Sequence, residues 1–451
     1  MRLIFDIETD DLNATKIWCI VAQDIDTNKI YKFPPDKLEE GYKFLQSAEQ
    51  LIGHNIIGFD IPMVEKFGNI KLTDNVVDTL VLSRLFNPTR EGGHSLDNWG
   101  YRLSYRKIEF EDYQNYSTEM LNYCVRDVQL NTLVYKRLQI ESKGFSKESV
   151  DLEHQVAKIM NQQEINGFSF DSKSATLLLA QLRERLQSVE DEVHKTFKPR
   201  WVDDRIVKPY IKKDGSLSKR GLTDDEYNTC LTNNDFEPFM RRKLEPFNLG
   251  SRKQIGEYLI EMGWKPERFT PTNQPIVDEK TLSQITHIHE AGLIAEFLLL
   301  QKRIAQIDSW IEAVSEDNRV HGFVIPNGTI TGRMTHRNPN MAQVPNLGSP
   351  FGKDCRACFT VPENYKLVGI DASGLELRML AHYMADDTYI NEVLHGDIHT
   401  TNQELAGLQT RDQAKTFIYA LVYGAGDAKI GKIAKGNIKK GKELKERFFK
   451  N

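Results

Sequence analysis

The sequence contains few cysteines and no long apolar run, and these absences exclude two classes of protein. Five cysteines, an odd number, are scattered over 451 residues, so a disulfide framework is not indicated. Cys355 and Cys358 form a single CxxC spacing, and we interpret them as packing residues rather than zinc ligands. No apolar run approaches the ~18 residues of a membrane span. Asp6 interrupts the first apolar run too early for a signal peptide, so a cytoplasmic protein without membrane contact is expected.

Bulk charge does not mark the chain as a nucleic-acid binder, because its net charge is −5. The local distribution is more informative. Segments 429–450 and 208–220 are rich in lysine and arginine. Basic segments of this kind are usually solvated faces, but they also bind phosphates. The length allows about three domains.

Arg411, Lys415, Tyr419 and Tyr423 recur every four residues in the run RDQAKTFIYALVYGAG. On a helix this spacing places all four on one face. Cations neutralise a triphosphate, and an aromatic ring stacks on a base. Taken alone, an exposed basic helix with core tyrosines explains the run equally well.

The segment KLVGIDASGLELRML precedes that run. Residues 365–370 are predicted to form an apolar strand that ends at Asp371, followed by a helix with Glu376 and Arg378. A carboxylate at a strand end is well placed to bind a metal. A helix cap at Asp371 is the alternative interpretation.

The N-terminus indicates a second, independent chemistry. Asp6 and Glu8 are two apart on an apolar strand, so both project from one face. Asp60 follows another apolar run, and Tyr123 and Asp127 are helix neighbours at i and i+4. Each fragment has an ordinary structural interpretation. Four acids from three segments together indicate a paired magnesium site.

The motifs DASGLELR and RDQAKTFIYALVYGAG resemble motifs A and B of the family A (Pol I-like) DNA polymerases. The resemblance is strongest to the replicative enzymes of T-seven-like bacteriophages, as shown by DASGLELR, GDIHT and Tyr419. The segment TGRMTHRNPNMAQVPN resembles the template-primer contact region of that family. It extends over essentially the whole chain. The resemblance implies a phage-encoded enzyme in the host cytoplasm that binds primer-template DNA, the 3′ end of single-stranded DNA and dNTPs. It also implies Mg²⁺ at two-metal sites, with Mn²⁺ as a substitute.

The resemblance also assigns roles to residues of the polymerase part. Asp371 would hold catalytic magnesium, and Glu376 would exclude a ribose 2′-hydroxyl. The triphosphate would be clamped by His399, Arg411 and Lys415. Tyr419 would touch the sugar and Tyr423 would stack near the templating base. The residues that would hold primer and template are Arg333, Gln343 and Arg356.

The N-terminal acids resemble those of the DEDD proofreading exonucleases that have a tyrosine in the third motif. By this analogy the metal ligands are Asp6, Glu8, Asp60 and Asp127. Tyr123 would orient the attacking water. Asn55 and Phe59 would line the site beside the 3′-terminal nucleotide.

The expected fold is α/β followed by α. A ribonuclease H-like 3′-5′ exonuclease domain (1–145) would precede a helical thumb (150–319), a partial palm (320–409) and partial fingers (410–451) of a right-hand fold. Strands are predicted at 2–7, 17–23, 29–33, 320–325 and 365–370. Helices are predicted at 37–48, 150–163 and 172–197. Residues 142–149 would be a polar hinge.

Two features depart from the family pattern. We find no motif C, the His-Asp hairpin that carries the second metal-binding carboxylate, so the palm is expected to be incomplete. A split gene completed by a second chain, a fragment, or a decayed polymerase kept for its exonuclease would each explain this. In the first case, apolar surface near Ile370 and Leu421 would bind the completing chain. If the chain acts alone, it is instead a 3′-5′ exonuclease with a DNA-holding module.

The second departure lies in the thumb. Residues 198–248 correspond to the insertion that binds thioredoxin in the phage enzymes, but the segment looks short. A turn at Asp214-Gly215 is predicted between basic strand-like pieces. A thumb-tip loop that touches duplex DNA is slightly favoured over a site for a thioredoxin-like processivity factor.

Overall fold

The computed structural model describes residues 1–450, which form two compact units, Met1–Tyr365 and a second that begins at Lys366. None of the helices in residues 1–450 is long and apolar enough to cross a membrane.

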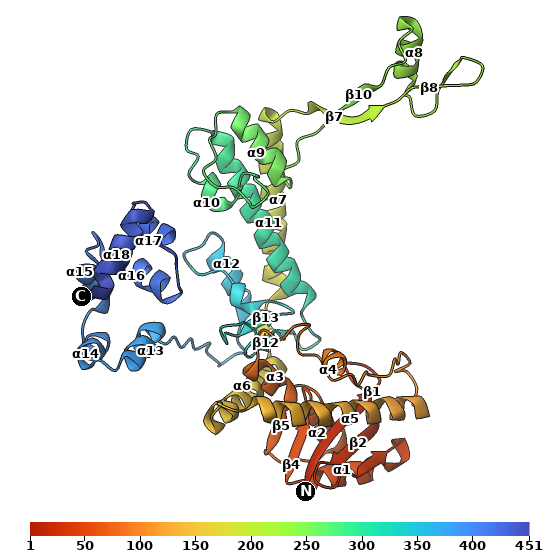
Figure 1. Cartoon of the computed structure of the whole chain (residues 1–451), viewed down its shortest axis with the longest axis vertical. Helices are drawn as coiled ribbons and strands as arrows, with labels where there is room; N and C mark the ends of the chain where they lie inside the picture. Colours follow the sequence, from red (N-terminus) through yellow and green to blue (C-terminus); the bar gives the residue numbers. More distant parts are fainter. Residues whose placement is uncertain (451) are drawn as a thin grey trace. The chain divides into compact units, whose positions relative to one another are not determined.

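The first unit begins with an α/β region (Figure 1). Its elements are β1 (Arg2–Thr9), β2 (Ile17–Asp24), β3 (Ile30–Phe33), α1 (Leu38–Gln46), β4 (Gln50–Gly53), α2 (Asp60–Gly68), β5 (Val76–Asp78), α3 (Thr79–Phe86), α4 (Leu96–Arg102) and α5 (Thr118–Glu141). The strand order is β3-β2-β1-β4-β5, antiparallel from β1 to β3 and parallel from β1 through β4 to β5. The three strands predicted before residue 34 and the helix at 37–48 are confirmed, apart from one or two residues at their ends.

Helices cover both faces of this sheet. Tyr42 of α1 and Val64 of α2 belong to the core on one face, and Met120 and Val128 of α5 belong to the core on the other. Each face therefore excludes water from the strands, as the nearly continuous apolar character of β1 and β2 requires.

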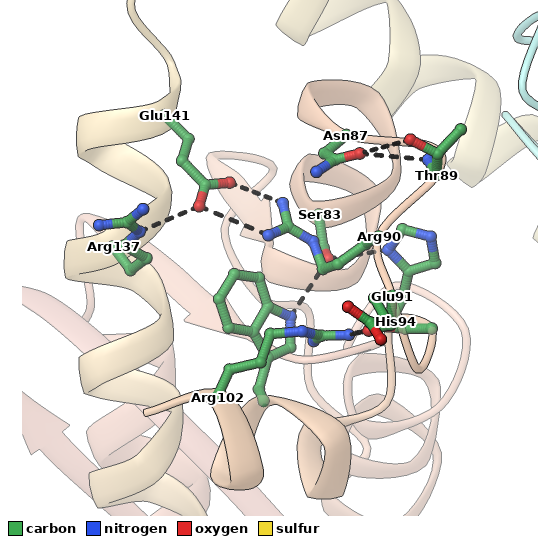
Figure 2. Close-up of polar contacts among 11 residues, drawn as sticks. Ser83, Asn87, Thr89, Arg90, Glu91, His94, Arg102, Arg137 and Glu141 are labelled. Carbon is green, nitrogen blue, oxygen red and sulfur yellow. Dashed lines mark hydrogen bonds and ion pairs between the residues drawn. The ribbon is translucent and has the colours of Figure 1, made fainter. Parts of the chain in front are cut away.

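A polar cluster fixes the C-terminal half of α5 to the connection between α3 and α4 (Figure 2). Glu141 accepts hydrogen bonds from Arg90 Nη2 at 2.6 Å and from Arg137 Nε at 3.0 Å. Ser83 Oγ lies 2.9 Å from His94 Nδ1. Burial, and then the positive charge of nearby arginines, lowers the pKa of His94 to about 4, so the ring is neutral at pH 7. These contacts hold α5 in position.

The remainder of the first unit is mainly helical. Its elements are α6 (Lys147–Asn166), β6 (Phe168–Phe170), α7 (Ser172–Thr196), β7 (Arg200–Val207), β8 (Tyr210–Ile211), β9 (Leu217–Ser218), α8 (Asp224–Asn233), β10 (Phe239–Glu245), α9 (Arg252–Glu261), α10 (Glu279–Leu282), α11 (His289–Glu312), β11 (Arg319–Val320), β12 (Phe323–Ile325), β13 (Thr335–Arg337), α12 (Gly352–Ala357) and β14 (Phe359–Thr360). The helices predicted at 150–163 and 172–197 are confirmed. The hinge 142–149 overlaps the connection between α5 and α6 but extends into the first turn of α6.

Residues 198–248 form a two-stranded ribbon of β7 and β10 that carries α8 and the short hairpin β8–β9. The predicted turn is present, with Gly215 at φ +82°, a conformation that glycine adopts without steric cost. Trp201 and Leu244 pair across the ribbon and are both more than half exposed.

Residues 366–450 of the second unit contain six helices, which are α13 (Leu375–Met384), α14 (Asp387–His395), α15 (Ile398–Ala406), α16 (Arg411–Val422), α17 (Asp427–Ile433) and α18 (Ile438–Lys450). Phe417 and Ile418 of α16 are fully buried in its core. A cavity of about 780 Å³ lies beside this core, and Leu421 lines it while half-buried.

The strand predicted at 365–370 is wrong. This segment has no strand, and Ile370 is 95% exposed. Apolar residues form a strand only where other strands accept their backbone hydrogen bonds, and within residues 1–450 no strand pairs with this segment.

Cys355 and Cys358 are both buried in the core of the first unit, as the packing interpretation predicted. Burial raises the pKa of the Cys358 thiol to about 11.

Candidate active site

The alternation of side chains along β1 directs two carboxylates toward α5. Leu3 and Phe5 pack with the core under α1 and α2, whereas Ile4 packs against α5. Successive side chains of a strand point to opposite faces. Asp6 and Glu8 therefore share the α5 face with Ile4, as the sequence predicted.

Two further carboxylates reach the same place from other elements. Asp60, in the first turn of α2, is 4% exposed and accepts a hydrogen bond from the Ile7 backbone N–H at 3.2 Å. Asp127 of α5 is also 4% exposed. Cys124 Sγ, one turn earlier on α5, lies 3.8 Å from Asp6 Oδ2. The structure thus brings together all four acids that the sequence singled out.

Burial and mutual repulsion make this cluster costly to ionise. Burial, and then the charges of Asp60 and Asp127, raises the pKa of Asp6 well above its ordinary value. Burial followed by the Asp6 charge does the same for Glu8. Burial raises the pKa of Asp60 to about 7. A cation bound here would relieve the repulsion, because it favours the ionised form of every carboxylate.

The donor set fits a hard divalent cation. All four acidic side chains offer oxygen, which Mg²⁺ prefers over nitrogen or sulfur. Asp127 Oδ1 is buried and has no hydrogen-bond partner. Oxygens of Asp6 and Glu8 lie within 4.8 Å of each other and of Cys124 Sγ. Carboxylates that are this close together and this well shielded from water rarely lack a counter-ion.

Asp60 predicts how stability changes with pH in metal-free protein. Its folded pKa of about 7 exceeds the ordinary 3.8 of an unfolded aspartate. Between pH 4 and 7 the folded state therefore retains a proton that the unfolded state releases. Stability falls as pH rises through this window, by about 1.4 kcal/mol per pH unit from this group.

We expect Asp60→Asn to raise the free energy of unfolding in EDTA at pH 8 by about 4 kcal/mol. The gain should shrink toward pH 4, because the unfolded state releases less and less of its Asp60 proton as the pH approaches 3.8. His54, whose pKa burial lowers to about 3, has the opposite dependence, but it is common to both proteins and cancels. Urea denaturation at pH 5 and pH 8 measures the difference. A variant with the same change in unfolding free energy at both pH values, or with a loss at pH 8, would contradict the prediction.

Tyr123 lies beside the carboxylates on α5, confirming the predicted helix pair with Asp127. Burial, and then the Asp127 charge, raises its pKa, so the hydroxyl stays protonated and can donate a hydrogen bond. Asn55 and Phe59 lie between β4 and α2. Asn55 is exposed, with φ +65° and its N–H bonded to Asp78 Oδ1 at 2.9 Å.

Sequence reasoning missed three residues of the connection between α4 and α5. Lys107 Nζ lies 2.5 Å from Asp127 Oδ2, and Phe110 stacks on Tyr123 with ring centroids 5.5 Å apart. Tyr113 meets the edge of Tyr123 at 6.4 Å. No pattern in the sequence indicated the aromatic contacts, because Phe110 and Tyr113 lie in a connection without helical or strand period. Nothing in the sequence indicated Lys107.

A second group of functional candidates lies on α16 and α15. Arg411, Lys415 and Tyr419 lie on α16, and Tyr423 is its C-cap residue, so the predicted helix is confirmed. His399 and Tyr419 have ring centroids 6.2 Å apart. Burial, and then the charges of Arg411 and Lys415, lowers the pKa of His399. The structure therefore groups His399, Arg411 and Lys415, the set assigned to triphosphate.

Arg411 also makes a contact that the sequence did not predict. Its Nε and Nη2 donate to the two carboxylate oxygens of Asp397 at 2.8 and 3.0 Å. Arg411 and then Thr400 hold the pKa of Asp397 far below its usual range. The guanidinium of Arg411 is thus held by the carboxylate of the residue that caps the N-terminus of α15.

Glu376 is hydrogen-bonded to Tyr423, whose hydroxyl lies 2.7 Å from Glu376 Oε1. Glu376 belongs to the first turn of α13, which begins after Gly374 in a left-handed conformation (φ +59°). Asp371 precedes this turn, in an exposed segment without a strand. The expectation that a buried strand fixes Asp371 is therefore wrong.

The candidate DNA contacts of the first unit are all exposed residues. Arg333 and Gln343 are exposed, and Gln343 lies in the short 3-10 helix Met341–Gln343. Arg356 of α12 is exposed as a residue, while its Nε donates to the Pro345 carbonyl at 2.7 Å.

Comparison with known families gives a match to the model described as DNA polymerase family A, over residues 225–451. The DNA-directed DNA polymerase of Enterobacteria phage T3 is 33% identical, over all of this chain and 79% of the relative. That of Escherichia phage T7 is 32% identical with the same coverage. DNA polymerase I of Helicobacter pylori strain 26695 is 27% identical, over 91% of this chain and 41% of the relative.

Among solved structures, the chain is similar to the POL domain of Pol1 from M. smegmatis in complex with DNA primer-template and dNTP. The TM-score is 0.71, and the match covers 99% of this chain and 72% of that one. At 16% identity this similarity establishes the fold.

Proposed function

The chain belongs to DNA polymerase family A, and from this premise we propose that it combines template-directed DNA synthesis in phage replication with a 3′-5′ proofreading exonuclease. The observation that carries the exonuclease is the convergence of four carboxylates from β1, α2 and α5, three of them buried and Asp6 half-buried. The strand order β3-β2-β1-β4-β5 is that expected of a ribonuclease H-like domain, and it supports the same proposal.

In the exonuclease, Asp6, Glu8, Asp60 and Asp127 would hold the metal ions. Bound Mg²⁺ supplies a Lewis acid for the phosphate oxygens and lowers the pKa of a bound water. The protein's own contribution is positioning. The protonated Tyr123 hydroxyl can hold the attacking water by a hydrogen bond, and Phe110 and Tyr113 fix the plane of its ring.

For synthesis, α16 and α15 would bind the incoming nucleotide. Arg411 and Lys415 would neutralise the triphosphate, a role that phosphoryl transfer requires more than covalent catalysis. Glu376, held by the Tyr423 hydroxyl, would occupy the space of a ribose 2′-hydroxyl. Arg333, Gln343 and Arg356 would contact primer and template. Asp371 would bind magnesium together with a further carboxylate, since the two-metal arrangement needs more than one.

A specific observation favours exonuclease activity without synthesis as the second candidate. The carboxylate site is buried and assembled within the first unit, whereas Asp371 lies in an exposed segment with no strand. In this alternative, residues 150–451 only hold DNA.

The experiment incubates the chain with a 5′-labelled single strand in Mg²⁺, and in parallel with primer-template and dNTPs. We expect shortening of the single strand one nucleotide at a time, which EDTA abolishes. Primer extension in the parallel reaction would support the combined activity. Shortening without extension would support the second candidate, and neither product would overturn both.

A further inference from the structure

Lys107 forms an ion pair with the carboxylate cluster. Its Nζ lies 2.5 Å from Asp127 Oδ2, and 4.7 Å from the centroid of the Tyr123 ring. The Lys107 side chain is 22% exposed and that of Asp127 is 5% exposed, so this ion pair is largely shielded from solvent. The ammonium therefore touches two of the residues assigned to the exonuclease reaction.

The surroundings keep this lysine charged. Its ammonium lies 2.5 Å from one oxygen of Asp127, and the carboxylates of Asp6 and Glu8 also act on it. Only one oxygen of Asp127 is paired, since Oδ1 has no hydrogen-bond partner. A single ammonium thus compensates part of the negative charge of four acids.

The connection that carries Lys107 is attached to the domain at several points. Trp18 Nε1 donates to the Tyr113 carbonyl at 2.9 Å, and the Tyr105 hydroxyl donates to Gln129 Oε1 at 2.7 Å. Phe110 stacks on Tyr123. Lys107 is therefore presented to the site by a packed segment, although its four-carbon stem can still swing.

We propose that Lys107 is a built-in counter-ion of the nuclease site that competes with a divalent metal for the charge of Asp127. This inference rests on the proposed exonuclease function. An ammonium on Oδ2 and a divalent cation on the unpaired Oδ1 would share one carboxylate charge and repel each other, so each weakens the binding of the other. The lysine stabilises the metal-free protein and lowers its affinity for metal.

The test compares the wild type with Lys107→Met, which keeps the length of the stem and removes the charge. In EDTA the variant should melt about 5 °C or more below the wild type, because Asp127 is left unpaired. Saturating Mg²⁺ should raise its Tm by more than it raises that of the wild type. Mn²⁺ titrated by calorimetry should bind at least about threefold more tightly. A purely structural ion pair would lower Tm without strengthening metal binding.

Lys71→Met is the matched control, because Lys71 makes a 3.2 Å ion pair with Glu65 on the exposed surface of the same domain. It should change none of the three measurements appreciably. If Lys107→Met aggregates in EDTA, its recovery in Mg²⁺ supports the proposal. Failure to recover, while Lys107→Met/Asp127→Asn folds, overturns it.

The outcomes separate the lysine from the nuclease site itself. A metal-induced rise in the wild-type Tm that Asp6→Ala/Glu8→Ala abolishes shows that the site binds metal. If Lys107→Met then shows an unchanged or smaller rise, the proposal for Lys107 is overturned alone. If neither wild type nor Lys107→Met responds to metal, both the counter-ion and the proposed nuclease site are overturned.

Discussion

Replacing Asp6 and Glu8 together by alanine should reduce the rate of single-strand degradation by about 10³-fold or more. A bound metal contributes several kcal/mol to stabilising the charge of a phosphoryl transition state, and about 1.4 kcal/mol corresponds to a factor of ten. Both carboxylates point from β1 toward Asp127 of α5, and Asp60 at the start of α2 completes the cluster. Removing two of four ligands leaves too few oxygens for a paired site.

Stability distinguishes this loss from misfolding. Burial raises the pKa of both Asp6 and Glu8, so their ionised forms destabilise the folded, metal-free protein. The double variant should therefore melt at the same temperature as the wild type in EDTA, or higher. Glu39→Ala/Glu40→Ala, which removes two exposed acids of α1, is the matched control and should degrade DNA at the wild-type rate. If Asp6→Ala/Glu8→Ala degrades DNA at more than about one tenth of the wild-type rate, other residues must cleave the DNA.

The predicted parts of this site share one property, which is that local periodicity determines them. Alternation on β1 placed Asp6 and Glu8 on one face, and the i, i+4 spacing placed Tyr123 beside Asp127. Both relations depend only on the type of the element. The sequence could therefore indicate which side chains face a common site, although it could not give the distances between elements.

Lys107 could not be predicted in this way. It lies in the connection between α4 and α5, where no helical or strand period fixes the direction of a side chain. Its position follows from tertiary contacts, such as the hydrogen bond from Trp18 to Tyr113. The strand predicted before Asp371 failed for a related reason. The residues were apolar enough, but a strand also needs partners in space, which composition does not reveal.

Replacing Arg411 or Lys415 by alanine should weaken binding of Mg²⁺·dNTP by about 10-fold to 100-fold each, since a hydrogen bond between charged groups contributes roughly 1.5–3 kcal/mol. The charges of Arg411 and Lys415 both act on His399, so the two cations are close enough to bind the same triphosphate. Arg411→Ala also leaves Asp397 without its partner, and the freed carboxylate would then repel the triphosphate. For this reason we expect Arg411→Ala to be the more severe of the two.

Asp397→Asn separates the two contributions of Arg411. It frees the guanidinium from its carboxylate and removes the repulsion, so dNTP binding should be equal to or tighter than wild type. Lys439→Ala on α18 removes an exposed lysine outside this group and should have no effect. Equilibrium titration with a fluorescent dNTP measures all four variants. If the chain acts only as a nuclease, α16 has no nucleotide to bind, and Arg411→Ala, Lys415→Ala and Lys439→Ala would be indistinguishable from the wild type.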